Sequence, residues 1–132
     1  MKDKVLAKLK VTLNELDFPT DTIIIQNSKN SDHGDFSTNI AMILARKLKL
    51  PPQQIADQII IKLIELNADN FFYGVEKAGP GFINFKLNKN LFHNQLLDVL
   101  NKDVDFGKSS IGVGKTANVE FVSANPTGPL TV

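Results

Sequence analysis

The spacing of hydrophobic residues predicts three helices in the first half of the chain. Apolar residues recur three and four positions apart over residues 4–16, which places them on one stripe of a helix. A second helix is expected to begin near Ser37, whose hydroxyl can cap it, and to stop at Pro51. Because proline costs no hydrogen bond in the first turn, Pro51 and Pro52 can also open a third helix, which ends around Asn67.

The pattern changes to period two in the middle of the chain, which predicts strands. Residues 71–78 and 82–87 are expected to form a hairpin around a Gly-Pro-Gly turn. Residues 23–25 form a β-branched run that predicts a buried strand, followed by a polar loop over residues 27–32. Side chains alternate faces along a strand, so one face of the second hairpin strand carries Ile83, Phe85 and Leu87 and the other carries Phe82, Asn84 and Lys86.

The last third of the chain predicts a fourth helix, a connector and one more strand. Asn88 can cap the helix. Its inward-facing residues are expected to be Leu91, Phe92, Leu96, Val99 and Leu100. Residues 103–116 contain glycine and serine and are expected to form a connector, and residues 117–122 the strand.

Together these elements predict an α+β fold. Helices and strands are mixed without a regular strand–helix–strand alternation, and the clearest strand pair is a hairpin. We therefore expect two layers, a largely antiparallel sheet with helices packed on one face. The connector marks a boundary between a first domain, residues 1–110, and a second segment, residues 111–132, which ends on apolar residues and is expected to be the start of a further domain.

Composition narrows the functional classes. The chain has 132 residues and no cysteine, which excludes disulfides, thiolate nucleophiles and cysteine-ligated metal sites. Its formal charge of +1 gives no global positive field for nucleic acid, so any such binding must be local. The first ten residues interleave lysines with apolar residues and resemble neither a signal peptide nor a membrane span. We expect a cytoplasmic protein without a membrane partner.

Short motifs elsewhere do not support an active site. Gly114-Lys115-Thr116 resembles the end of a phosphate-binding loop, but Ser109 stands where that motif needs glycine. His33 and His93 lie far apart without a carboxylate at metal-ligand spacing, so no metal site is predicted. The triplet of residues 33–35, His-Gly-Asp, is open to two interpretations, a functional loop or turn chemistry.

One strand face carries chemistry that suits RNA. Phe82 can stack on a base, Asn84 can bond to a base edge and Lys86 can contact a phosphate. Three such residues at alternate positions more often form an ordinary solvated strand face, so the residue types alone leave both interpretations open.

The surrounding sequence resembles arginyl-tRNA synthetases, which are class I enzymes. The segment VEFVSANPTGPL at residues 119–130 resembles the stretch that leads into their nucleotide-binding signature. The segments HGDFSTNIA at residues 33–41 and AGPGFINF at residues 78–85 resemble the amino-terminal additional domain of that family. The resemblance implies that residues 1–110 contact the D-loop of tRNA for arginine, with Phe82 and Asn84 holding a base. Lys86 is added on electrostatic grounds.

The resemblance also assigns roles to residues near the end of the chain. It implies that Glu120 pairs with the substrate guanidinium and that Ser123 and Asn125 hold arginine and the nucleotide. The family's signature has a histidine where this chain has Thr131, so that histidine's role is reduced or shifted. The complete enzyme would use ATP and magnesium to attach arginine to its tRNA. The chain alone is expected to have no catalytic residues, no metal and no activity.

Two further functions remain possible on sequence grounds. The near-neutral charge favours an assembly or structural domain with little RNA contact, whereas a stand-alone regulatory paralogue fits the segment at residues 111–132 less well. The exposure of Phe82 distinguishes the structural domain from a base-binding one, because a packing role requires that ring to be buried. We expect a monomer that binds tRNA weakly, with a Kd of roughly 10⁻⁴ to 10⁻⁶ M.

Overall fold

The computed structural model of the chain describes residues 1–28, 34–121 and 128. Its elements in chain order are α1 (Lys2–Glu15), β1 (Ile25–Asn27), β2 (Phe36–Thr38), α2 (Ile40–Leu48), α3 (Pro52–Glu65), β3 (Phe72–Ala78), β4 (Phe82–Leu87), α4 (Lys89–Lys102) and the 3₁₀ turn η2 (Asp103–Asp105). The chain divides into two compact units, Met1–Leu97 and Asp98–Val132, and the division falls within α4.

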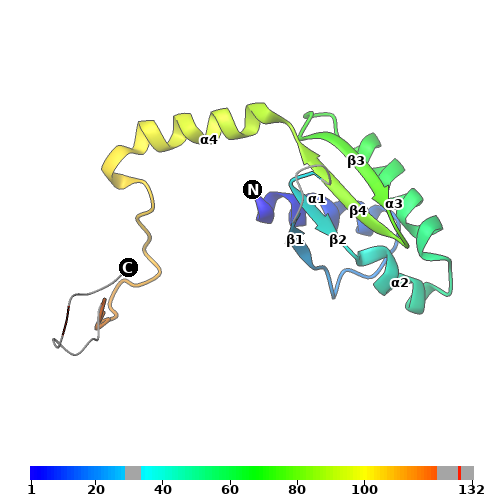
Figure 1. Cartoon of the computed structure of the whole chain (residues 1–132), viewed down its shortest axis with the longest axis horizontal. Coiled ribbons are helices and arrows are strands. Elements are labelled where there is room, and N and C mark those ends of the chain that lie inside the picture. The colour runs from blue at the N-terminus through cyan, green and yellow to red at the C-terminus, as the bar shows by residue number, and fades with distance from the viewer. Residues whose placement is uncertain (29–33, 122–127, 129–132) are drawn as a thin grey trace. The chain divides into compact units, whose positions relative to one another are not determined.

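The first unit has the predicted α+β architecture, with a four-stranded sheet in the order β1-β2-β4-β3. All three strand pairs are antiparallel. Helices α1, α2 and α3 lie on one side of the sheet (Figure 1). The expected fold class, an antiparallel sheet with helices on one face, is therefore confirmed.

The core lies between the sheet and the three helices. Apolar residues at helical spacing on α1 and α3 are fully buried there, as the sequence pattern predicts. Phe85 on β4 is completely buried, and its ring lies 5.4 Å from the ring of Phe72 on β3. The Asn67 side chain joins the end of α3 to β3, since it donates to the Phe72 carbonyl oxygen (2.8 Å) and accepts from the Phe72 amide (3.0 Å).

The predicted hairpin and the proline-opened helix are confirmed. β3 and β4 pair in antiparallel register, with Ala78 opposite Phe82. Pro51 and Pro52 stand at the start of α3 as expected. Gly81 has a φ of +140° and packs so closely on the α2–α3 junction that an added Cβ would lie 2.9 Å from Pro52. Glycine is therefore needed in this turn both for its backbone angle and for space.

The region around β1 and β2 differs from the sequence prediction. The strand is Ile25–Asn27 rather than residues 23–25, and Ile24 is exposed. Ser37 does not cap a helix, because it belongs to β2. The hydroxyl that bonds to the start of α2 is that of Thr38. Its Oγ1 accepts from the Ile40 amide (3.3 Å) and donates to the Ile24 carbonyl oxygen (2.8 Å).

The expected burial of the fourth helix is wrong. Asn88 does cap α4, because its Oδ1 accepts from the Asn90 amide (3.0 Å). However, α4 has no buried residue, and among its predicted inward-facing residues Leu91 packs partly on the core while Phe92, Leu96 and Leu100 are exposed. A helix can bury an apolar stripe only against another element, and no element in the described part of the chain covers this one.

The expected strand over residues 117–122 is also not found. Residues 117–121 form no strand, and Val122 lies outside the described residues. A strand needs a neighbour for its backbone hydrogen bonds, and the described ranges provide no such neighbour here.

Candidate nucleic-acid interface

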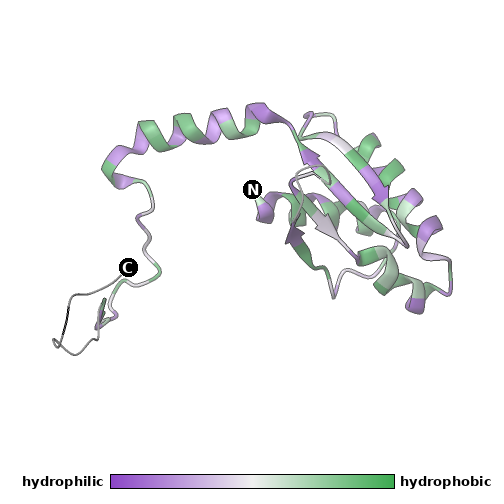
Figure 2. Ribbon diagram, in the orientation of Figure 1, coloured by the Kyte–Doolittle hydropathy of each residue, from purple (hydrophilic) through white to green (hydrophobic). Residues whose placement is uncertain are grey.

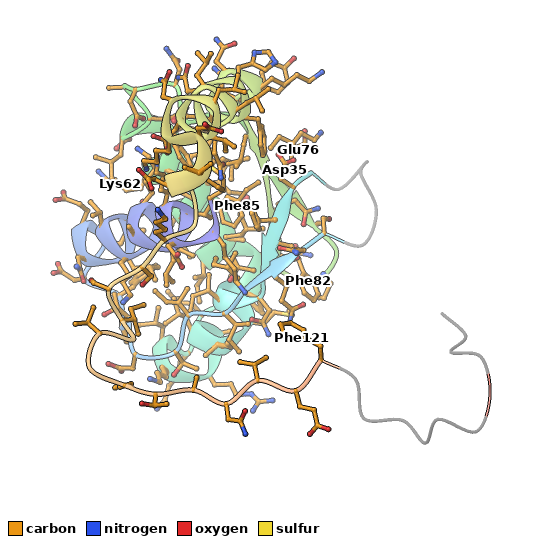
Figure 3. All side chains as sticks on the ribbon, turned by 90° about the vertical axis from the view of Figure 1, so that its left-hand side faces the viewer. Asp35, Lys62, Glu76, Phe82, Phe85 and Phe121 are labelled. Atoms are coloured by element: carbon orange, nitrogen blue, oxygen red, sulfur yellow. The ribbon has the colours of Figure 1, made fainter. Side chains whose placement is uncertain are left out.

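The candidate site lies on the face of the sheet opposite the helices. Ile83, Phe85 and Leu87 on β4 are buried against the helical layer. Side chains alternate along the strand, so Phe82, Asn84 and Lys86 project from the other face. Figure 3 agrees, because Phe85 lies on the side of the strands that faces α1 and Phe82 lies on the opposite side. Figure 2 shows the strands coloured by hydropathy, with both purple and green segments along β4.

Phe82 is accessible on this face. Its side chain is 38% exposed, and the residue opposite it on β3 is the small Ala78. An aromatic ring that is partly exposed above a small neighbour can accept another flat ring by stacking. The ring of Phe82 is therefore not enclosed by the packing of the domain.

Asn84 is much less accessible than its position suggests. It is 6% exposed, although it projects from the same face as Phe82. Its direct neighbours across the sheet are Ser37 on β2 and Glu76 on β3. The sequence predicted the face of Asn84 but not its burial, because burial depends on side chains brought in by other strands.

The charge of Lys86 is already paired. Its Nζ lies 2.7 Å from Oε1 of Glu76 in an ion pair that runs diagonally across β4 and β3, next to Asn84. Both side chains are partly exposed, so the pair is screened by solvent and contributes little stability. Lys86 therefore offers no uncompensated positive charge on this face.

Asp35 and Gly34 fix the position of β4. The Asp35 amide donates to the Phe85 carbonyl oxygen (2.8 Å), and Asp35 Oδ2 accepts from the Leu87 amide (2.7 Å). Gly34 lies so close that an added Cβ would be 2.6 Å from the same Phe85 oxygen. These contacts favour turn chemistry for the His-Gly-Asp triplet, although His33 lies outside the described residues. The adjacent glycine and aspartate, both common in turns, were the sequence feature that indicated a turn here.

Comparison with known proteins identifies the family. The family model described as the arginyl tRNA synthetase N terminal domain matches residues 3–87, which is more than half of the chain. The chain belongs to this family. The matched range ends with β4, so it includes the helical layer and the whole sheet.

Relatives of this N-terminal domain are arginine–tRNA ligases. The chain is 43% identical over 121 residues to the arginine–tRNA ligase of Geotalea daltonii, covering 92% of the chain and 21% of that protein. It is 44% identical over 119 residues to the arginine–tRNA ligase of Rhizobium etli, covering 90% of the chain and 20% of that protein. The chain thus spans about a fifth of the length of the curated relatives it matches.

Solved structures support the same fold. The arginyl-tRNA synthetase of Thermus thermophilus matches with a TM-score of 0.60 and 20% identity, over 74% of the chain and 16% of that protein. The enzyme of Plasmodium falciparum also gives a TM-score of 0.60 at 20% identity, over 72% and 17%. At this identity the likeness shows the fold of the N-terminal domain.

Of the residues predicted to hold arginine and the nucleotide, the structure describes only Glu120. Glu120 is exposed, and Ser123, Asn125 and Thr131 lie outside the described residues. Within the described ranges, no group of three histidine, aspartate or glutamate residues could hold a metal ion. Likewise, no helix in the described part of the chain has the length and apolar character needed to cross a bilayer.

A separate cavity lies between α1 and α3 and has a different character. It has a volume of about 260 Å³ and is lined partly by Val11, Leu63 and Leu66. Lys8, which also lines it, forms an ion pair of 2.8 Å with Asp69, and this hydrogen bond lowers the pKa of the Asp69 carboxyl. The walls are mainly apolar, so this cavity offers little of the polar chemistry that the sheet face provides.

Proposed function

We propose that this chain is the tRNA-binding N-terminal domain of an arginine–tRNA ligase and contacts the D-loop at the outer corner of tRNA for arginine. The observation that carries the proposal is the partly exposed Phe82 ring on the sheet face opposite the helices, in a domain of this family. Phe82 stacks on a D-loop base, Asn84 supports the base edge from beneath, and Lys86 contacts a phosphate.

The charge distribution implies weak binding by the domain alone. The formal charge is +1, and Lys86 must exchange its Glu76 partner for a phosphate. Affinity that depends on few phosphate contacts is low and falls as salt rises, with a Kd of roughly 10⁻⁴ to 10⁻⁶ M at physiological salt. The rest of the enzyme would supply most of the affinity for tRNA.

A binding titration at low salt tests the proposal. The 132-residue chain is titrated with tRNA for arginine and with the same tRNA carrying a changed D-loop base. Phe82→Ala is expected to cost about 1–3 kcal/mol, which is roughly a five- to 150-fold rise in Kd, because a stacked base is lost. Tyr73→Ala is the matched control, since Tyr73 is a highly exposed aromatic residue on β3.

The outcomes separate the possible roles of the domain. Loss of affinity for Phe82→Ala and for the changed tRNA, with Tyr73→Ala unaffected, supports a base-binding site. An equal effect of the two aromatic substitutions would indicate general surface contact. Equal binding of both tRNAs, or no binding, would overturn the proposed base recognition.

The complete ligase is proposed to attach arginine to its tRNA in the cytoplasm, with ATP and magnesium. In that enzyme Glu120 would pair with the guanidinium of arginine, and Ser123 and Asn125 would hold arginine and the nucleotide. ATP would supply the activation of the arginine carboxylate. We assign residues 1–110 to the tRNA-binding domain and residues 111–132 to the start of the catalytic domain, and we propose that the chain alone is an inactive monomer.

The exposed face of α4 favours a second, structural role. Phe92, Leu96 and Leu100 are exposed and fall at helical spacing, so they form an apolar stripe on one side of α4. This stripe would pack against another part of the ligase. Leu96→Lys is expected to lower the unfolding temperature of the full-length ligase but not that of the 132-residue chain, as thermal denaturation of both proteins would show. Equal effects on the two would contradict this role.

A further inference from the structure

Strand register places four polar side chains in one row across the sheet. Gln26 on β1 lies opposite Ser37 on β2, and Ser37 lies opposite Asn84 on β4. Asn84 in turn lies opposite Glu76 on β3. Directly paired residues project from the same face of a sheet, so all four share with Phe82 the face opposite the helices.

The members of this row differ in accessibility. Asn84 is buried, whereas Ser37 is half-buried and Gln26 is exposed. Glu76 is engaged with Lys86 at the opposite end of the row. A molecule that approaches this face therefore meets the Gln26 amide and the Ser37 hydroxyl more readily than the Asn84 amide.

The chemistry of Gln26 and Ser37 suits a nucleotide. An amide offers two N–H donors and a carbonyl acceptor, and a hydroxyl both donates and accepts, so together they can satisfy a base edge or a ribose 2′-hydroxyl. Both are uncharged and therefore do not repel phosphate. Three neighbouring strands span two interstrand spacings, about 10 Å, so Gln26 reaches well beyond the base stacked on Phe82.

We propose that Gln26 and Ser37 are specificity-determining residues that hydrogen-bond the nucleotide next to the one stacked on Phe82. This inference rests on the proposed function and extends the RNA contact from β4 across β2 to β1. Asn84 lies between Ser37 and Glu76 in this row and keeps its proposed contact with the base on Phe82. A protein partner would instead be expected to bring apolar surface to this row, for which the four polar side chains are a poor match.

Two alanine substitutions and a matched control test this inference. Gln26→Ala and Ser37→Ala in the 132-residue chain are each expected to raise the Kd for tRNA about three- to tenfold, the value of one hydrogen bond. Asn27→Ala is the control, because Asn27 is also exposed on β1 but projects from the opposite face. Its Kd is expected to stay within about twofold of the unsubstituted chain.

A charge substitution gives an independent reading. Gln26→Glu keeps the length of the side chain but places a negative charge beside the RNA backbone, so it is expected to weaken binding more than Gln26→Ala does. This additional loss should shrink as salt is raised. Thermal unfolding of each variant establishes that the fold is retained, which an exposed position such as Gln26 permits.

The results distinguish failure of this inference from failure of the proposed function. If Phe82→Ala weakens binding but no substitution at Gln26 or Ser37 does, the extended contact is wrong and the proposed base site at Phe82 stands. If the unsubstituted chain does not bind tRNA at low salt, both proposals are overturned. If Asn27→Ala weakens binding as much as Gln26→Ala, the contact does not depend on the sheet face and the inference is again overturned.

Discussion

Replacing Gly34 with alanine is expected to destabilise the first unit strongly. Gly34 has a φ of +86°, in the left-handed region where a Cβ atom is unfavourable. The new Cβ would also lie 2.6 Å from the Phe85 carbonyl oxygen and 3.0 Å from Lys86 Cγ. The lysine side chain can move, but the carbonyl belongs to the backbone of the central strand β4 and cannot.

The expected magnitude follows from the contacts that must shift. A left-handed backbone angle costs about 1–2 kcal/mol for alanine. Relief of the clash requires residues 34 and 35 to move away from β4, which weakens the hydrogen bonds from the Asp35 amide to the Phe85 oxygen and from the Leu87 amide to the Asp35 carboxylate. One neutral and one charged hydrogen bond add roughly 2–3 kcal/mol, for a total loss of about 3–5 kcal/mol.

Gly79→Ala is the matched control for this prediction. Gly79 has a φ of +52° in the hairpin turn, but an added Cβ would meet no atom within 4 Å. This variant therefore has the cost of the backbone angle without the clash, and alanine partly offsets that cost by restricting the unfolded chain. We expect a loss of about 1 kcal/mol or less.

Urea unfolding followed by circular dichroism measures both variants in the 132-residue chain. The free energy of unfolding should differ by roughly 3 kcal/mol between Gly34→Ala and Gly79→Ala. In a unit of this size the difference corresponds to more than about 10 °C in Tm. If the two variants lie within about 1 kcal/mol of each other, the close approach of residue 34 to β4 is not a stabilising feature and the reasoning fails.

Two other predictions concern paired charges. The hydrogen bond from Lys8 holds the pKa of Asp69 below its usual value, so the stability it adds is present above the unfolded pKa and is lost as pH falls through the folded pKa. Urea midpoints should therefore fall more on acidification for the unsubstituted chain than for Asp69→Asn, and identical pH profiles would contradict this linkage. Glu76→Gln releases Lys86 from its ion pair and is expected to lower the Kd for tRNA about two- to fivefold at low salt. An unchanged or higher Kd would count against a phosphate contact by Lys86.

The sequence determined the features that depend on neighbouring residues. Helical spacing over residues 4–16 gave the buried stripe of α1, and the paired prolines placed the start of α3. The Gly-Pro-Gly turn and the period-two pattern around it identified the hairpin and the face of Phe82. These signals are local, because a turn type or a helical stripe is encoded within a few consecutive residues.

Tertiary structure decided the features that join distant segments. β1 and β2 have three residues each, too few for a periodic pattern, and Ser37 entered a strand because β4 lies beside it. The same pairing buried Asn84 and aligned it with Gln26, which is far away in sequence. Side chains from strands that meet only in the folded sheet determine which polar groups are accessible, so the sequence predicted the face of Phe82 but not the polar row beside it.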